Sequence, residues 1–188
     1  MQGAAVLIFT AYTPAYREYA EALDVSCQLW GFALFVIPIP ESGSWVKNCA
    51  RKGHLCDATR GQSSGPILWL DADAEVRRSL DELPALCAGY DVAHGVRGKK
   101  VLSGTVWLAD TPKARELCED WAARCTAEPQ VWDQRHLADA IEATGVKALA
   151  LPPAYCYIDT ISAREHPDVE PIIYHKQASR VMKAKVGR

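Results

Sequence analysis

Two aspartates separated by one residue carry the clearest chemical signal in the chain. Asp71 and Asp73 directly follow the apolar residues 66–70. If that run is a strand, its side chains alternate between faces, so both carboxylates project to the same side. They would leave the sheet at its carboxyl edge, where ligands of open α/β sheets bind. Such a pair suits Mg²⁺ or Mn²⁺ carrying a phosphate, although aspartates after a strand also cap helices or solvate loops.

The residues around this motif predict alternating strands and helices. Continuous apolar runs indicate buried strands. Thr13 followed by Pro14 is typical of a helix start, and Gly31 ends that helix. A β-α-β-α-β order predicts a parallel sheet with right-handed crossovers. The predicted strands are residues 4–10, 32–37 and 66–70, and the predicted helices between them are residues 13–30 and 45–60.

The second half of the chain predicts a mixture of both element types. We expect an α/β fold: a single Rossmann-like domain of three layers, with a central mixed sheet that is mostly parallel in its N-terminal half. Residues 1–176 would form this domain, and residues 177–188 would form a basic tail. The predicted helices are residues 79–87, 112–125 and 132–144, and the predicted strands are residues 91–96, 101–108, 146–151, 155–158 and 171–175.

The composition narrows the class of protein. A chain of 188 residues with 49% hydrophobic and 23% charged residues favours one folded domain. The net charge of −2 argues against a dedicated nucleic-acid binder. Seven cysteines without a C-x-x-C pair disfavour both a disulfide framework and a zinc knuckle, and they suggest a reducing, cytoplasmic compartment. We find no convincing signal peptide and no apolar run long enough to span a bilayer.

Four sequence blocks, taken together and in order, resemble small GT-A type glycosyltransferases. The likeness covers nearly the whole chain and is closest to retaining enzymes of the glycogenin and galactosyltransferase kind and their bacterial and phage relatives. The blocks are similar to the metal-binding D-x-D, the strand that lines the donor-sugar site, the D-Q-x-x-L block and the late histidine of that family. They read ILWLDAD at 67–73, LSGTVWL at 102–108, WDQRHL at 132–137 and IYHK at 173–176.

The resemblance implies a metal site formed by Asp71, Asp73 and His175, with Ala72 between the two carboxylates in the donor-binding motif. A metal there would bridge the diphosphate oxygens and offset charge on the departing nucleoside diphosphate. An imidazole ligand favours Mn²⁺ over Mg²⁺. His175 could instead be an ordinary surface histidine beside a basic tail.

The resemblance also implies where the rest of the donor binds. Thr10, Ala11 and Tyr12 leave the first strand where the family contacts the nucleobase and ribose. Ser103 can donate a hydrogen bond to a sugar hydroxyl, and Gly104 lets the substrate approach the backbone closely. Tyr12 and Gly104 also fit ordinary packing roles.

Asp133 and Gln134 are the residues expected to hold the donor or acceptor sugar, although Asp133 could simply cap the helix that it opens. Lys52 lies on the second predicted helix, where the family often places a basic residue facing the phosphates, and the adjacent Arg51 is the alternative. The basic turn at residues 97–100 is a further candidate for contact with phosphate or acceptor.

The expected function is metal-dependent transfer of a sugar from a nucleotide-diphosphate sugar, with UDP as the default nucleotide. The acceptor is open among a glycan, a protein, a lipid-linked sugar, a small molecule and a modified nucleic acid, and the oligomeric state is open too. The resemblance leans towards retention. One alternative is a sugar nucleotidyltransferase, but residues 10–14 lack the glycine-rich, basic loop that such enzymes use. Another is a non-catalytic binding module with the same fold.

Overall fold

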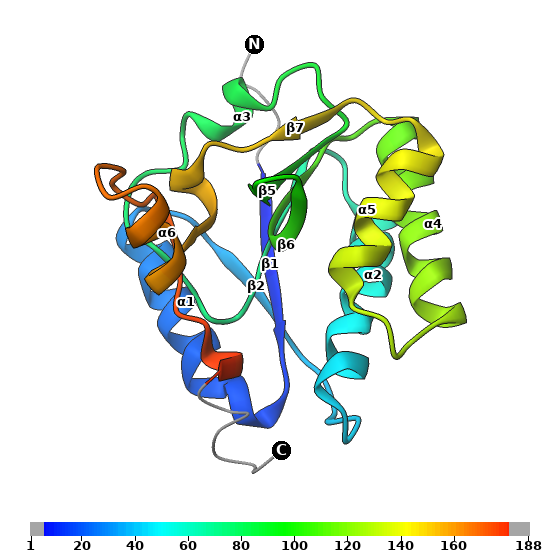
Figure 1. Cartoon of the computed structure of the whole chain (residues 1–188), viewed down its shortest axis with the longest axis horizontal. Helices are drawn as coiled ribbons and strands as arrows, with labels where there is room; N and C mark the ends of the chain where they lie inside the picture. The colour runs from blue at the N-terminus through cyan, green and yellow to red at the C-terminus, as the bar shows by residue number, and fades with distance from the viewer. Residues whose placement is uncertain (1–5, 181–188) are drawn as a thin grey trace.

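A six-stranded mixed sheet forms the centre of the protein, whose computed structural model describes residues 6–180 (Figure 1). The strand order is β2-β1-β3-β6-β5-β7. Within this described sheet β6 runs against its two neighbours, and every other pairing is parallel. The expected mixed, mostly parallel sheet is therefore confirmed. The strands are β1 (Leu7–Tyr12), β2 (Leu34–Pro38), β3 (Ile67–Leu70), β5 (Val92–Arg97), β6 (Lys100–Leu108) and β7 (Ala148–Ala150).

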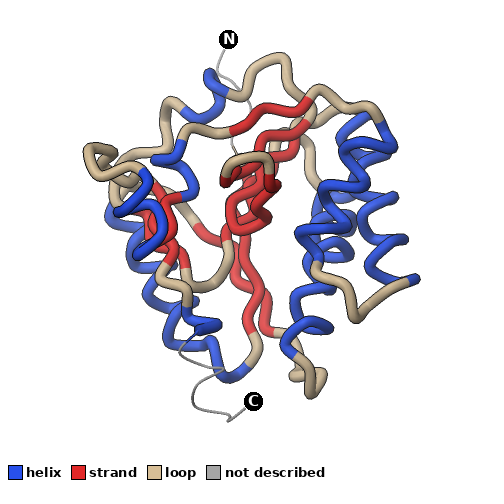
Figure 2. Tube along the Cα trace, in the orientation of Figure 1, coloured by secondary structure: helices blue, strands red, loops and turns tan. Residues whose placement is uncertain are grey.

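Helices cover both faces of the sheet and produce the expected three layers (Figure 2). On one side α2 packs against α4, and α4 against α5. On the other side lie α1 and a small second sheet. The bounds are α1 (Arg17–Leu29), α2 (Trp45–Gln62), α4 (Pro112–Ala127) and α5 (Asp133–Thr144), with short turns at η1 (Pro14–Tyr16), α3 (Leu83–Leu86), η2 (Pro153–Cys156) and α6 (Asp159–Glu165).

The middle of β1 and all of β3 are buried on both faces, which is why their sequences read as continuous hydrophobic runs, whereas the edge strand β2 is partly exposed. Ile8 and Leu68 point into the core shared with α1, whereas Phe9, Ile67 and Trp69 point into the core beneath α2, α4 and α5. Neighbouring residues of one strand thus serve two different cores. A strand packed this way can hold its carboxyl end rigidly, and that end carries the candidate site.

A small second sheet consists of β4 (Ala74–Val76), β9 (Ile173–His175) and β8 (Tyr157–Ile158), in the order β4-β9-β8. The strands predicted at residues 155–158 and 171–175 contain β8 and β9, but β4 and the pairing of the three strands were not predicted. With only three residues, β4 is too short for a periodic signal. The antiparallel register pairs Ala74 with His175. This pairing brings the end of the chain beside the Asp71–Asp73 motif.

Several predicted elements differ from the observed ones at their ends. The helix predicted at residues 79–87 is only the single turn α3, which begins beside Pro84. Residues 159–165 form α6, which was not predicted, and residues 155–156 belong to a 3₁₀ turn and not to a strand. Thr13 makes no side-chain cap, since a 3₁₀ turn precedes α1, whereas Thr111 caps α4 by accepting a hydrogen bond from the backbone of Ala114.

Parts of two predictions fall outside the described residues: the first two residues of the strand predicted at 4–10, and most of the basic tail, including Lys183, Lys185 and Arg188. Among residues 6–180, no helix combines the length and the apolar character needed to cross a membrane.

Candidate active site

Asp71, Asp73 and His175 lie together at the carboxyl edge of the central sheet. Each offers one ligand atom, and these atoms all lie within 4.8 Å of one another. The two aspartates meet through a turn and not through strand alternation, because β3 ends at Leu70 and the backbone N–H of Ala74 donates to the carbonyl of Asp71 (2.8 Å). The sequence therefore groups the right residues, but the strand geometry assumed for them is wrong.

Each aspartate has one oxygen held by the protein. Oδ1 of Asp71 accepts from Nε1 of Trp69 (2.9 Å) and forms an ion pair with Nζ of Lys52 (2.7 Å). Oδ2 of Asp73 accepts from the backbone N–H of Ala178 (2.8 Å). Oδ1 of Asp73 instead lies 3.8 Å from Nδ1 of His175. The carboxylates are thus fixed in orientation while one oxygen of each remains for a ligand.

The ring of His175 is buried and oriented from behind. Its Nε2 lies 2.9 Å from the hydroxyl of Thr105, which is itself fully buried. With a proton on Nε2 donated to that hydroxyl, the Nδ1 lone pair points towards the carboxylates, as in metal sites whose histidines are held by an outer hydrogen bond. Apart from its position one residue after Gly104, nothing in the sequence marked Thr105 as part of the site.

Gly104 keeps the space beside this ring open. A Cβ atom at this position would lie 3.0 Å from Cε1 of His175 and 3.4 Å from Oδ2 of Asp71. A side chain would crowd both groups. Two carboxylate oxygens and one imidazole nitrogen, together with this space, fit a divalent cation such as Mn²⁺.

The pKa values of the cluster reflect its charges. Burial by itself raises the pKa of Asp73, but hydrogen bonding and charge from His175 outweigh burial and lower it. Burial by itself lowers the pKa of His175, but Cys156 and the Asp73 carboxylate outweigh burial and raise it to about 10. Near neutrality the ring of His175 therefore carries a second proton, and a metal ion that bound Nδ1 would have to displace it.

Lys52 stands at the centre of a second polar group, in which Lys52, Ser103 and Asp133 are buried and Asp71 is partly exposed. Besides Asp71, its Nζ lies 3.1 Å from Oδ2 of Asp133 and 3.0 Å from the carbonyl of Ser103. The hydroxyl of Ser103 donates to the same Asp133 oxygen (2.7 Å). Burial lowers the pKa of Lys52, but Asp133 and Asp71 raise it well above its usual value. The lysine is therefore a permanent cation shared between two carboxylates.

The structure places Lys52, and not Arg51, in this cluster. The guanidinium of Arg51 is exposed and donates to the carbonyl of Pro40 (2.7 Å), outside the site. Asp133 is the first residue of α5, but its carboxylate bonds Ser103 and Lys52. Gln134 follows it on α5 and is half-buried.

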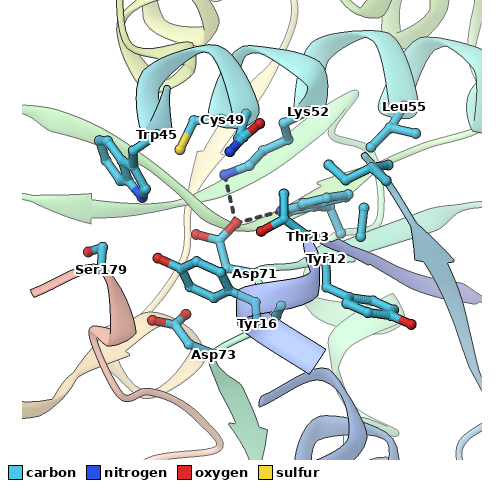
Figure 3. A pocket seen from close by; sticks show the side chains of 15 residues that line it. Tyr12, Thr13, Tyr16, Trp45, Cys49, Lys52, Leu55, Asp71, Asp73 and Ser179 are labelled. Carbon is cyan, nitrogen blue, oxygen red and sulfur yellow. Dashed lines mark hydrogen bonds and ion pairs between the residues drawn. The ribbon is translucent and has the colours of Figure 1, made fainter. Parts of the chain in front are cut away.

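An open pocket lies in front of these groups (Figure 3). The ends of β1 and β3, the η1 turn and one face of α2 form its walls, and the side chains of Lys52, Asp71 and Asp73 reach into it. Ala11, Tyr12 and Ala72 line it as expected. Thr10 is fully buried and does not line this pocket, whereas Ser103 and Gly104 lie behind it, next to Lys52 and His175.

The pocket also contains residues that motif matching missed. Tyr16, Trp45, Cys49 and Ser179 line it, and they come from three segments far apart in sequence. An aromatic residue at the start of a helix is a weak signal, so sequence reasoning had little means to select them.

The basic turn at residues 97–100, expected as a candidate phosphate or acceptor contact, is partly engaged elsewhere: Arg97 forms an ion pair with Glu165 of α6 (2.8 Å).

Comparison with known proteins supports the fold. No protein-family model matches the chain, and neither does any curated protein. A glycosyltransferase involved in glycosylation of the major capsid of PBCV-1 has a similar structure: TM-score 0.70, 13% identity, covering 97% of this chain and 99% of that one. The apo form of GlyE, a glycosyltransferase of Streptococcus pneumoniae TIGR4, is also similar, with TM-score 0.65 and 15% identity. This match covers 93% of the present chain but only 54% of the GlyE chain. The chain therefore has the GT-A fold of these glycosyltransferases.

Proposed function

We propose that the protein is a metal-dependent glycosyltransferase that uses a nucleotide-diphosphate sugar, with a UDP-sugar as the default donor. The observation that carries this proposal is the Asp71–Asp73–His175 cluster, whose two aspartates line a pocket in a GT-A fold. Fold alone does not fix function, so the argument rests on the chemistry of these ligands. Their hard oxygen and imidazole donors suit Mn²⁺, and next Mg²⁺.

In this proposal different side chains bind different parts of the donor. Asp71, Asp73 and His175 hold the cation, which supplies Lewis-acid stabilisation of the leaving diphosphate. Tyr12 lies on the pocket wall, where its ring can stack on the nucleobase.

Asp133 and Ser103 are proposed to bind hydroxyls of the transferred sugar, and Lys52 is proposed to lie on the phosphate side of the donor, next to Asp71. All three are fixed before the substrate arrives, because each already bonds another member of the group. Preorganised polar groups cost no reorganisation during the reaction. Gln134, next on α5, is proposed to contact the donor or acceptor sugar.

The first residues of the proposed tail border the site. We propose residues 1–176 as the catalytic domain, with residues 177–188 as an extension whose described start is packed on it: Ala178 is buried and bonds Asp73, and Ser179 lines the pocket. We also propose a cytoplasmic location, which the seven free cysteines support.

A thermal-shift screen of UDP, GDP, CDP, ADP and TDP, each with Mn²⁺, Mg²⁺ or EDTA, tests the proposal. A ligand that binds only the native state raises the melting temperature by mass action. We expect one diphosphate to stabilise the protein with Mn²⁺ and not with EDTA. If no pair does so, the protein is a non-catalytic module and the proposal fails. Release of pyrophosphate from a nucleoside triphosphate and a sugar phosphate would instead identify a nucleotidyltransferase.

A further inference from the structure

Two tryptophans meet where α2 and α5 begin. The ring centroids of Trp45 and Trp132 lie 6.0 Å apart, with the ring planes at 87°. Trp45 is the first residue of α2, and Trp132 immediately precedes α5. This edge-to-face contact fixes the two indoles relative to each other and to both helices.

Trp132 is unusually exposed for its residue type. The side chains of Trp69, Trp107 and Trp121 are buried in the cores, whereas Trp132 is 54% exposed. Trp30 is also exposed, at 43%, but it lies after the far end of α1. An indole held in place with much of its surface in water is a ready binding surface, since its burial by a ligand would be favourable.

The position of the pair ties this surface to the donor site. Trp45 lines the pocket together with Asp71 and Asp73 (Figure 3). Trp132 contacts Trp45 and is followed directly by Asp133, which is proposed to hold the transferred sugar together with Ser103. A group resting on Trp132 would therefore lie next to the part of the pocket wall that Trp45 forms.

We propose that Trp132 is the platform for the acceptor, and that the acceptor is a glycan whose pyranose ring stacks on the indole. This inference rests on the proposed function. The C–H face of a pyranose is apolar and its hydroxyls lie around the rim, so the ring can cover an indole while a hydroxyl faces the donor. That hydroxyl oxygen bonds to the anomeric carbon of the donor, the bond from this carbon to the diphosphate oxygen breaks, and the hydroxyl proton passes to the released nucleoside diphosphate.

The charges favour a sugar over a nucleic acid as the stacking partner. A nucleobase would bring a phosphate backbone, whose binding depends on several basic side chains. The buried cation of the site, Lys52, is already shared between Asp71 and Asp133, and the chain as a whole has a net charge of −2. A neutral pyranose carries no such requirement.

Saturation-transfer NMR with methyl glycosides of glucose, galactose, mannose, N-acetylglucosamine, xylose and rhamnose tests the proposal, with UDP and Mg²⁺ present. We expect one or more glycosides to bind the wild type and Trp30→Ala equally, and to bind Trp132→Ala about tenfold more weakly. Trp132→Phe should lie between them, because a smaller aromatic face remains. A melting temperature close to that of the wild type shows that each variant is folded.

Three outcomes would overturn the platform: no glycoside binds the wild type, Trp132→Ala binds glycosides as well as the wild type, or an oligothymidine binds in their place and is lost in Trp132→Ala. Failure of the proposed function would give a different result, because the thermal-shift screen would then find no nucleotide–metal pair that stabilises the protein. Glycoside binding that is lost in Trp132→Ala would still establish a carbohydrate site in that case.

Discussion

The group around Lys52 and the pair formed by Asp73 and His175 lie side by side but are built differently. Lys52 is buried, and its ammonium contacts Asp71, Asp133 and Ser103 at 2.7 to 3.1 Å. Asp73 and His175 face each other at 3.8 Å, and each is held from behind by another hydrogen bond. The first group is closed by contacts among its own members, whereas in the second Oδ1 of Asp73 and Nδ1 of His175 lie close together, with Asp71, as candidate ligand atoms.

This difference separates two kinds of contribution. Removing a member of the closed group leaves a buried charge without its partner, so the fold should suffer. Removing a member of the open pair takes away a ligand atom, so binding should suffer while the fold persists. Asp71 belongs to both groups, which makes it a poor choice for telling them apart.

Asp73→Ala should have the largest effect of the changes considered. It removes one proposed metal ligand, so we expect Mn²⁺-dependent turnover of the donor to fall by about a hundredfold or more. The melting temperature without metal should fall less than in Lys52→Met, because His175, the charged partner of Asp73, can lose its proton. Donor turnover and thermal unfolding measure the two effects, with the exposed Asp168→Ala as the matched control. Wild-type turnover in Asp73→Ala would show that the metal site is wrongly assigned.

Lys52→Met should mainly lower stability. Asp133 would be left buried without its cation, so we expect the free energy of unfolding to fall by about 3 kcal/mol. Urea unfolding measures this change. Lys47→Met, an exposed position on the same helix, should change stability by less than about 0.5 kcal/mol. Equal stabilities of the two variants would contradict the view of Lys52 as the centre of a closed group.

Thr105→Val should weaken metal binding without removing a ligand. The hydroxyl that holds Nε2 of His175 is lost, and changes to such outer partners typically reduce metal affinity by about tenfold or more. Calorimetric titration with Mn²⁺ in the presence of UDP measures the affinity, and Thr105→Ser should recover most of it. If serine and valine behave alike, the hydroxyl does not orient the ring.

The affinity for Mn²⁺ should rise with pH. Burial lowers the pKa of His175, but Cys156 and Asp73 outweigh it and raise the pKa to about 10, so the metal-free ring is protonated near neutrality. Binding must then release a proton, and the affinity should increase by up to about tenfold per pH unit below that pKa. Titrations between about pH 6.5 and 8 test this sign. An affinity that stays constant over this range would exclude His175 as a ligand protonated before binding.

Local patterns identified most of the central sheet and its helices because long apolar or amphipathic segments carry strong periodic signals. They could not identify β4, whose three residues are ordered by pairing with β9, nor that pairing itself. The same limit applies to the site. Asp71 and Asp73 are visible as a motif, but the choice of Lys52 over Arg51 depends on which side chain α2 turns towards Asp133.

The sequence by itself determined the fold class, because strands buried on both faces must read as apolar runs. It also determined the types of ligand atoms, since these are properties of single residues. Only the tertiary structure decided which residues complete the candidate metal site. His175 lies more than a hundred residues after Asp71 and reaches it through the pairing of β4 with β9. Thr105 and Ala178 then fix the orientations of the histidine and of Asp73 through contacts that no local pattern encodes.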